Sequence, residues 1–599
     1  VRQGLDRLDD IDPGRRGVDH VGGPEPPCPL QLPPVDVDGD HRPSAGQRRR
    51  GDGGTADATA ADDGDGVAPR HPARVHGGTE PGHHAAPDEA GGLGPGLLGR
   101  IFDGIQRPLE TLACADGDPY GVPAIERGAA PPPIDRSREW EFEPAAAEGE
   151  EVGPGDLLGT VRETPGLVHR VLVPQGAAGV VTDVRAGPAR VEDPVAWIAG
   201  EPVTMLRRWP VRDALPVARR LDPDAPLLTG QRVVDTLFPL ARGGTATMPG
   251  GFGTGKTVLE HSLAKWSDAD VVVYVACGER GNELAEVLRD FPALADPRTG
   301  GSLMERTIIV ANTSNMPVAA REASIYTGIT LAEYYRDQGY HVALLADSTS
   351  RWGEALREVS SRLEEMPAEE GYPAYLAARL AEFYERAGGA VCLGRDGRHG
   401  SVTVVGAVSP PGGDFSEPVT QHSLRLAGTF WALDTALARQ RHFPAVDWGR
   451  SYALYRLDEW FEREVAGGWA EQRAWALSLL QREQSLLEMV QLLGADALAA
   501  GEQVVLRVGR LLREDFLQQS SFDPLDASCP PAKQFWMLNV VRCAAASIQT
   551  AVDRGVAPGV AGSVAALADI ARMRAWPEAE AAERARSLAE RIEQEVGAL

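Results

Sequence analysis

The sequence predicts an α/β protein in which a parallel sheet follows a β-rich module and precedes a helical segment. Beyond Thr229, short apolar runs alternate with helical stretches, which is typical of a parallel sheet covered by helices. From residue 139 to 203, short strand-like runs are separated by Gly and Pro. Over roughly the last 160 residues, apolar side chains recur at helical spacing. These three patterns set the order of the predicted parts.

Residues 1–92 differ from the rest of the chain in composition. They contain no Lys, Phe, Tyr, Trp or Met, and they hold six of the twelve histidines. Such a segment cannot bury enough apolar surface to offset its ordering entropy, so we expect no stable fold before about Leu93. Two interpretations stay open: a disordered tail, or an out-of-frame translation of a GC-rich gene.

Core-forming residues appear from Leu93 onward. Residues 93–110 are predicted to begin the α/β domain, and residues 111–200 to form an inserted β-rich module. The strand-like runs of this module lie at 141–144, 156–161, 169–174 and 179–184. None of these runs carries residues that suggest chemistry.

Residues 250–257 read Gly-Gly-Phe-Gly-Thr-Gly-Lys-Thr, the spacing of a glycine-rich phosphate loop. Glycines let successive backbone N–H groups converge on a polyphosphate, while Lys256 reaches the β- and γ-phosphates and the Thr257 hydroxyl binds Mg²⁺. Because the chain has 67 Gly but only three Lys, composition alone produces this spacing about 0.003 times per chain. The loop therefore predicts a nucleotide site built from Gly250, Gly251, Phe252, Gly253, Thr254, Gly255, Lys256, Thr257 and Val258.

Four apolar runs are predicted as strands of the sheet, at 271–275, 307–311, 341–346 and 402–405. Ligands of such sheets lie beyond the carboxyl ends of the strands, so the residues after each run are candidates. Glu279 and Arg280 follow the first run, where a carboxylate can orient the attacking water and an arginine can hold the γ-phosphate. Asp347 follows the third run and fits an acid in the Mg²⁺ shell, although a strand-end Asp is also a common helix N-cap.

The segment 441–599 is predicted to be helical. Apolar residues recur at helical spacing, with charges on the opposite faces, at Leu479, Leu486, Leu487 and Val490 and again at Leu588, Ile592 and Val596. We expect these two stripes to form core or a subunit interface.

Composition excludes several classes of function. The net charge of −26 argues against nucleic acid as a partner, because a phosphate backbone requires a basic surface. The chain has no apolar run of 18 residues and no visible signal peptide, so we expect a cytoplasmic protein that can still be peripheral to a membrane complex. The six cysteines are scattered without metal-ligand spacing, which predicts free thiols.

Seven segments together resemble the catalytic A subunit of V-type and A-type rotary ATPases. They are residues 231–239, 250–257, 266–270, 278–283, 312–317, 346–352 and 410–418. The match runs from about Leu93 to the end of the chain. It implies a RecA-like P-loop nucleotide-binding domain over 201–440 that begins at 93–110, with the β-rich inserted module at 111–200 and a C-terminal helical domain at 441–599.

The sequence departs from the family's pattern in two places. The β-barrel of the family is not recognisable in residues 1–92, which favours the out-of-frame interpretation. The loop has Gly251 and Thr254 where the family usually has Pro and Ser. Because Gly251 restores a backbone N–H that Pro lacks, we expect phosphate binding and catalysis to survive both changes.

The resemblance also implies roles by position. It implies that the catalytic residues are Lys256, Glu279 and Arg280, and that the ligands of Mg²⁺ are Thr257 and Asp347. It implies further contacts to ATP or ADP from Arg351, which supports the metal ligands, and from Phe415 and Phe516 near the adenine. An aromatic at position 516 is as often a core residue.

The implied function is ATP hydrolysis or synthesis at an interface with the B subunit, coupled to proton or sodium transport across a membrane. The implied partners are the B subunit in an alternating A3B3 ring and the central-stalk and peripheral-stalk subunits, at the cytoplasmic face of the membrane. A RecA-like hexameric helicase is an alternative, but it needs a basic, aromatic RNA-binding module that residues 139–203 do not provide. A non-catalytic, nucleotide-holding component of the same rotor is a second alternative, against which Glu279 argues.

Overall fold

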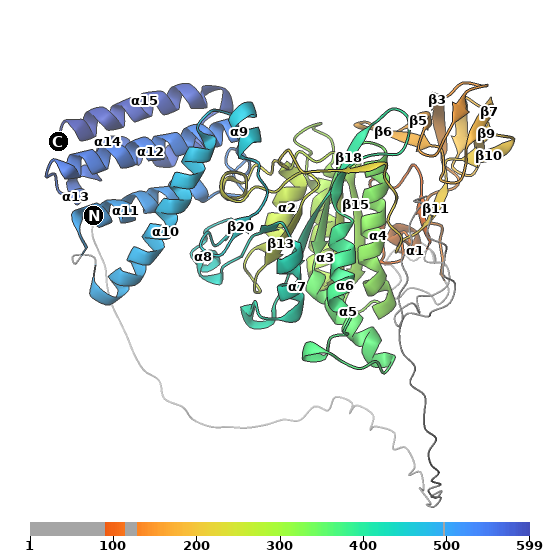
Figure 1. Cartoon of the computed structure of the whole chain (residues 1–599), viewed down its shortest axis with the longest axis horizontal. Coiled ribbons are helices and arrows are strands. Elements are labelled where there is room, and N and C mark those ends of the chain that lie inside the picture. The colour runs from red at the N-terminus through yellow and green to blue at the C-terminus, as the bar shows by residue number, and fades with distance from the viewer. Residues whose placement is uncertain (1–89, 114–128, 495–497) are drawn as a thin grey trace, which may run out of the picture. The chain divides into compact units, whose positions relative to one another are not determined.

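The computed structural model describes residues 90–113, 129–494 and 498–599 (Figure 1). Of the segment predicted to lack a stable fold, residues 1–89 lie outside the described residues, so both interpretations of it stay open. Strand β1 (Ala90–Leu93) pairs antiparallel with β11 (Arg207–Pro210). This pairing joins the first described residues to the segment that follows the β-rich module. The predicted limits of the individual domains stay a prediction.

A ten-stranded sheet is at the centre of the described structure. Its parallel strands are, in order, β2 (Ile101–Phe102), β15 (Thr307–Thr313), β14 (Val271–Glu279), β16 (His341–Asp347), β18 (His399–Val408), β13 (Thr245–Pro249) and β19 (Thr429–Phe430). Antiparallel pairing adds β20 (Tyr452–Ala453) to β19, β17 (Gly388–Val391) to β18, and β12 (Arg219–Leu221) to β17. The four strands predicted from apolar runs are confirmed, and so is the α/β class.

Both faces of this sheet are buried, which explains why its strands are continuous apolar runs. In β14, Val271 and Val273 belong to one hydrophobic cluster, whereas Val272 and Tyr274 belong to the other. The first face is covered by α4 (Val318–Asp337), α5 (Thr349–Arg362) and α6 (Leu376–Glu385). The second is covered by α2 (Lys256–Trp266) and α3 (Gly281–Ala293) (Figure 1). Shorter helices are α1 (Leu109–Ala113), α7 (Pro418–Leu426) and α8 (Thr435–Arg439).

The β-rich module consists of two four-stranded antiparallel sheets. One has the order β6 (Leu167–Leu172), β5 (Leu157–Thr164), β3 (Glu139–Pro144) and β8 (Gly187–Arg190). The other has the order β10 (Glu201–Thr204), β9 (Pro194–Ile198), β7 (Gly179–Val184) and β4 (Glu151–Val152). In β3, Trp140 and Phe142 are buried while the glutamates beside them are exposed, the alternation of a strand with one dry face. The predicted strands of this module are confirmed.

A buried charged cluster joins the module to helix α4. Glu163 accepts hydrogen bonds from the backbone N–H groups of residues 96–98 at 2.7 to 3.2 Å, and its carboxylate lies 2.8 Å from His169 Nδ1. The Tyr335 hydroxyl donates to Glu163 at 2.9 Å, and His169 Nε2 lies 2.9 Å from the Tyr334 hydroxyl. Burial opposes ionisation of Glu163, but His169 and the backbone donors hold the pKa of this carboxyl below its ordinary value.

The C-terminal segment is helical, as predicted. Its helices are α9 (Asp458–Glu464), α10 (Trp469–Leu493), α11 (Ala500–Leu511), α12 (Pro531–Asp553), α13 (Pro558–Ala561), α14 (Ala565–Ala568) and α15 (Glu578–Gly597). The predicted stripe of α15 is confirmed, since Leu588, Ile592 and Val596 are buried. The α10 stripe holds only in part, because Leu487 is 39% exposed. In the described part of the chain, no helix is both long and apolar enough to cross a membrane.

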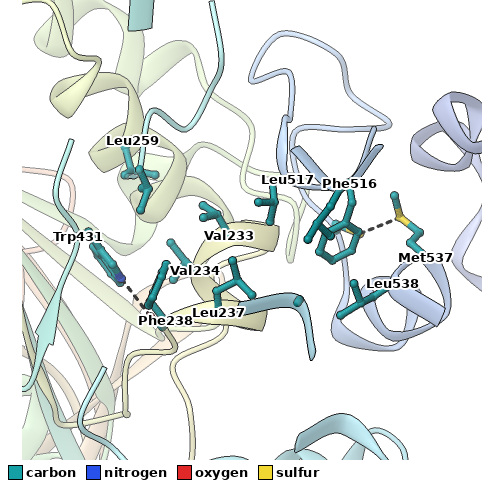
Figure 2. Packing of buried hydrophobic residues seen from close by; sticks show 14 of the residues in the cluster. Val233, Val234, Leu237, Phe238, Leu259, Trp431, Phe516, Leu517, Met537 and Leu538 are labelled. Atoms are coloured by element: carbon teal, nitrogen blue, oxygen red, sulfur yellow. Dashed lines mark hydrogen bonds between the residues drawn. The ribbon is translucent and has the colours of Figure 1, made fainter. Parts of the chain in front are cut away.

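Residues 231–237, which precede β13, pack against the C-terminal helices (Figure 2). Val233, Val234 and Leu237 share one hydrophobic cluster with Phe516 and Met537. This packing holds residues 231–237, which lead into β13 and the phosphate loop, against a segment almost 300 residues later in the chain.

A buried ion pair stabilises the same contact. The guanidinium of Arg232 is fully buried and lies 2.7 Å from Asp526, and it also donates to the backbone carbonyls of Phe516 and Gln518. A buried charge is tolerated only when it is paired and hydrogen-bonded. These partners therefore fix the position of residues 231–237 relative to residues 516–526.

Candidate active site

The phosphate loop connects β13 to the N-terminus of α2, as residues 250–255. Gly253 and Gly255 have φ angles of 77° and 83°, where a side chain would be strained, and open space lies beside both. A Cβ atom on Gly250 would instead lie 2.6 Å from Thr254 Oγ1. The loop therefore requires glycine for its conformation at two positions and for its packing at a third. The N–H groups at the start of α2 add an anion-binding end to it.

Lys256 is held within the loop by two backbone oxygens. Its Nζ donates to the Gly250 carbonyl at 2.6 Å and to the Gly251 carbonyl at 3.2 Å. Burial lowers the pKa of Lys256, and the nearby carboxylate of Asp347 opposes this effect. An ammonium has three donors, so one remains for a phosphate oxygen.

Thr257 and Asp347 meet beside the loop. The Thr257 hydroxyl donates to Asp347 Oδ2 at 3.4 Å, and the Tyr274 hydroxyl donates to the same oxygen at 3.4 Å. Asp347 ends strand β16 and is only 3% exposed, and burial raises its pKa. A hydroxyl and a carboxylate brought together in this way supply the hard oxygen ligands that Mg²⁺ prefers. The residues present therefore fit the metal.

Glu260 is a buried carboxyl next to this pair that the sequence reasoning missed. It is 0% exposed, and neither of its oxygens has a hydrogen-bond donor among the described residues. Burial, followed by the charge of the neighbouring Asp347, raises the pKa of Glu260 well above its usual range. Its place one helical turn after Lys256 is the sequence signal that could have identified it, since positions i and i+4 share a helix face.

Glu279 lies at the end of β14, directly after a β-bulge. The register of β14 against β15 shifts between Cys277 and Glu279, and Gly278 at the bulge has a φ of 69°. Burial and then the Glu283 carboxyl raise the pKa of Glu279 to about 8. A carboxyl with such a pKa is still partly ionised at neutral pH and can accept a proton or orient a water.

Arg280 is the next residue and points back toward the loop. Its guanidinium lies 5.1 Å from the ring centre of Phe252, which is 82% exposed, and 3.8 Å from a Glu283 oxygen. Arg351, in the first turn of α5, lies close to Gly278, because a Cβ there would be 3.2 Å from Arg351 Cβ. The structure therefore brings the predicted arginines to the same end of the sheet as the loop.

The two aromatic residues predicted near adenine differ in their surroundings. Phe415 is half-buried, lies 6.1 Å from Phe430 and has the Arg450 guanidinium 4.5 Å above its ring. Phe516 is fully buried in the hydrophobic core, beside Leu517 and the side chains of α12 (Figure 2). In this conformation Phe516 cannot stack on a base, whereas Phe415 stays accessible.

Three family models match the chain over most of its length. The nucleotide-binding domain of the ATP synthase alpha/beta family matches residues 230–453. The barrel-sandwich domain of that family's alpha and beta chains matches residues 131–212, and the C-terminal domain of V and A type ATP synthase matches residues 458–557.

Curated relatives extend this similarity. The A subunit of the A-type ATP synthase of Methanopyrus kandleri is 58% identical over 84% of this chain and 86% of its own length. The V-type ATP synthase alpha chain of Anaeromyxobacter dehalogenans is 60% identical over 75% of this chain and 77% of its own. The A subunit of the A-type ATP synthase of Thermococcus onnurineus is 55% identical over 82% of this chain and 84% of its own.

Proposed function

This chain belongs to the family of the catalytic A subunits of A-type and V-type ATP synthases, and we propose that residues 250–257 bind the ATP or ADP on which it acts. Its activity is the hydrolysis or synthesis of ATP coupled to ion transport. The observation that supports the proposed site is that Lys256, Thr257 and Asp347 meet at one loop, with Glu279 at the adjacent strand end.

We assign the ground-state contacts to the loop and the metal ligands. The free donor of Lys256 and the loop N–H groups bind the β- and γ-phosphates, while Thr257 and Asp347 hold Mg²⁺. When bound, Mg²⁺ neutralises charge on the phosphate oxygens. Phe415 and residues near it border the adenine.

Glu279 orients the attacking water in this proposal. Phosphoryl transfer to water depends mainly on positioning and electrostatics, and a carboxylate at this strand end faces the phosphate loop. Arg280 and Arg351 lie beside the same site and stabilise the γ-phosphate region and the metal ligands. The neighbouring B subunit completes the site in an alternating ring. Central-stalk and peripheral-stalk proteins connect this ring to the cytoplasmic face of a membrane.

The test of this assignment is Glu279→Gln in the complex reconstituted with the B subunit. A glutamine keeps the size of the side chain but is a poor base, so turnover should fall by about 10²- to 10⁴-fold while Mg-ATP binding is unchanged. Glu286→Gln is the matched control, because Glu286 is exposed on α3 and should leave both quantities unchanged. Full turnover in Glu279→Gln would remove Glu279 from the catalytic assignment.

A further inference from the structure

Arg321 is a charged residue that is only 9% exposed, in the first turn of α4, and it touches three segments. Its Nη2 donates to the Ser314 carbonyl at 2.9 Å, in the loop after β15. Its backbone carbonyl accepts a hydrogen bond from Cys277 Sγ at 3.4 Å, near the end of β14. Its Nη1 lies 4.0 Å from Glu358 on α5. One residue therefore connects the carboxyl ends of two neighbouring strands.

The aliphatic part of Arg321 fills the space beside the β14 bulge. A Cβ atom on Gly278 would lie 2.9 Å from Arg321 Cδ and 3.2 Å from Arg321 Nε. The backbone of Glu279 is tied to the same arginine through Ser314, whose N–H donates to the Glu279 carbonyl at 3.0 Å. Arg321 thus contacts the residue before Glu279 directly and Glu279 itself through one intermediate residue.

The contacts of Arg321 come at an energetic cost. Its Nε is buried and has no acceptor among the described residues. Leaving a buried donor of a charged group unpaired is unfavourable, and a shorter apolar side chain at this position would avoid the cost. The packing against Gly278 and the hydrogen bond to Ser314 offset this cost.

We propose that Arg321 is a positioning residue, which fixes the β14 bulge and so sets the direction in which Glu279 presents its carboxylate. The inference rests on the proposed catalytic role of Glu279. Because glycine has no Cβ, residue 278 can adopt several backbone conformations, and the arginine stem and the Ser314 bond select the one with a φ of 69°. A misplacement of about 1 Å at such a group can cost about 10²-fold in rate.

The test uses Arg321→Met and Arg321→Lys in the reconstituted complex, with kcat and KM for Mg-ATP measured separately. Methionine keeps most of the stem but loses the bond to Ser314, so kcat should fall by about 10- to 10²-fold while KM stays near that of the parent. Lysine keeps the stem and the charge, so Arg321→Lys should recover part of the lost kcat. The matched control is Arg289→Met, an exposed arginine of α3 that pairs with Asp290 and should change neither constant.

A double variant separates positioning from general stability. If Arg321 acts through Glu279, adding Arg321→Met to Glu279→Gln should lower turnover no further than Glu279→Gln alone. If Arg321→Met fails to fold, Arg321→Lys carries the same comparison.

Three outcomes would overturn the inference: an unchanged kcat in assembled Arg321→Met, a loss of Mg-ATP binding equal to the loss of kcat, or a loss of activity that follows only from failed assembly with the B subunit. The last outcome would assign Arg321 to the interface between the two proteins. A parent complex without ATPase activity would instead contradict the proposed function, which keeps the two failures distinguishable.

Discussion

The side chain of His261 makes the stability of α2, the helix that follows the phosphate loop, depend on pH. It lies on α2, with its ring 5.0 Å from Phe291 and 6.2 Å from Tyr274, and its Nε2 has no partner among the described residues. Burial lowers the pKa of His261 to about 4. The folded protein therefore holds this imidazole neutral, whereas the unfolded chain protonates it near pH 6.5.

This difference predicts an acid-dependent loss of stability in α2. Between about pH 6.5 and 4 the unfolded form binds more protons than the folded form. The contribution of His261 to the free energy of unfolding is therefore fully present above about pH 6.5 and is lost as the pH falls toward 4. Between about pH 7.5 and 5 the opening free energy of α2 should fall by about 2 kcal/mol from this group. Native-state hydrogen exchange of the α2 amides measures it. His261→Phe should flatten the pH dependence, and His399→Phe, at an exposed histidine, should leave it unchanged.

Individual residues of the candidate site were predictable where a motif or a strand end marked them. Lys256 and Thr257 follow from the glycine spacing, and Asp347 from its place after an apolar run. For Glu260 the one available signal was its place one helical turn after Lys256. Arg321 carried no such signal, because its importance comes from contacts between α4 and the strand ends, and a buried charge on a helix looks in sequence like an exposed one.

At the scale of elements, the Arg232–Asp526 pair determines how the C-terminal helices are attached to the nucleotide-binding domain. Both side chains are 0% exposed. Arg232→Met should destabilise the chain by about 3–5 kcal/mol, because it leaves the Asp526 carboxylate buried without its cation. Thermal unfolding of the full chain measures the effect.

The double variant Arg232→Met/Asp526→Leu serves as its control. Removing both charges abolishes the unpaired carboxylate, so the double variant should be more stable than Arg232→Met alone. A surface pair gives the comparison, since Arg289→Met breaks only the exposed contact to Asp290 and should melt close to the parent. A double variant that is less stable than the single one would contradict this account of the pair.

The elements themselves were largely predictable, but their contacts were not. Strands β14, β15, β16 and β18 are buried on both faces, so their apolar runs stand out in the sequence. The α10 stripe is less regular, because Leu487 faces solvent in the described chain. The packing of residues 231–237 on Phe516 joins segments almost 300 residues apart, and no local pattern encodes such a contact.

At the scale of the whole molecule, the isolated chain should be nearly inert as an ATPase. Arg280 and Arg351 already lie beside Glu283 and Gly278, so the proposed mechanism takes its remaining arginine from the neighbouring B subunit. An arginine supplied in trans is typically worth about 10³–10⁵ in rate, or roughly 4–7 kcal/mol of barrier. Repositioning one group within the chain cannot replace it.

The measurement compares the purified chain with the reconstituted ring. Nucleotide binding by the isolated chain is established first, and turnover is then measured before and after the B subunit is added. An isolated chain that hydrolyses ATP as fast as the ring would show that the site is complete without a neighbour.

The buried cluster of Glu163 and His169 has a consequence for the order in which the chain folds while it is being translated. Its partner Tyr335 lies 172 residues after Glu163. At about 5–20 residues per second, roughly 10–30 s pass on the ribosome before α4 is made. Until then Glu163 has only the N–H groups of residues 96–98 and His169 as partners, and the side that α4 covers stays open to water. The Tyr335 hydrogen bond therefore completes the cluster last, and faster amide exchange at Leu97 in chains arrested before α4 than in the full chain would reveal this order.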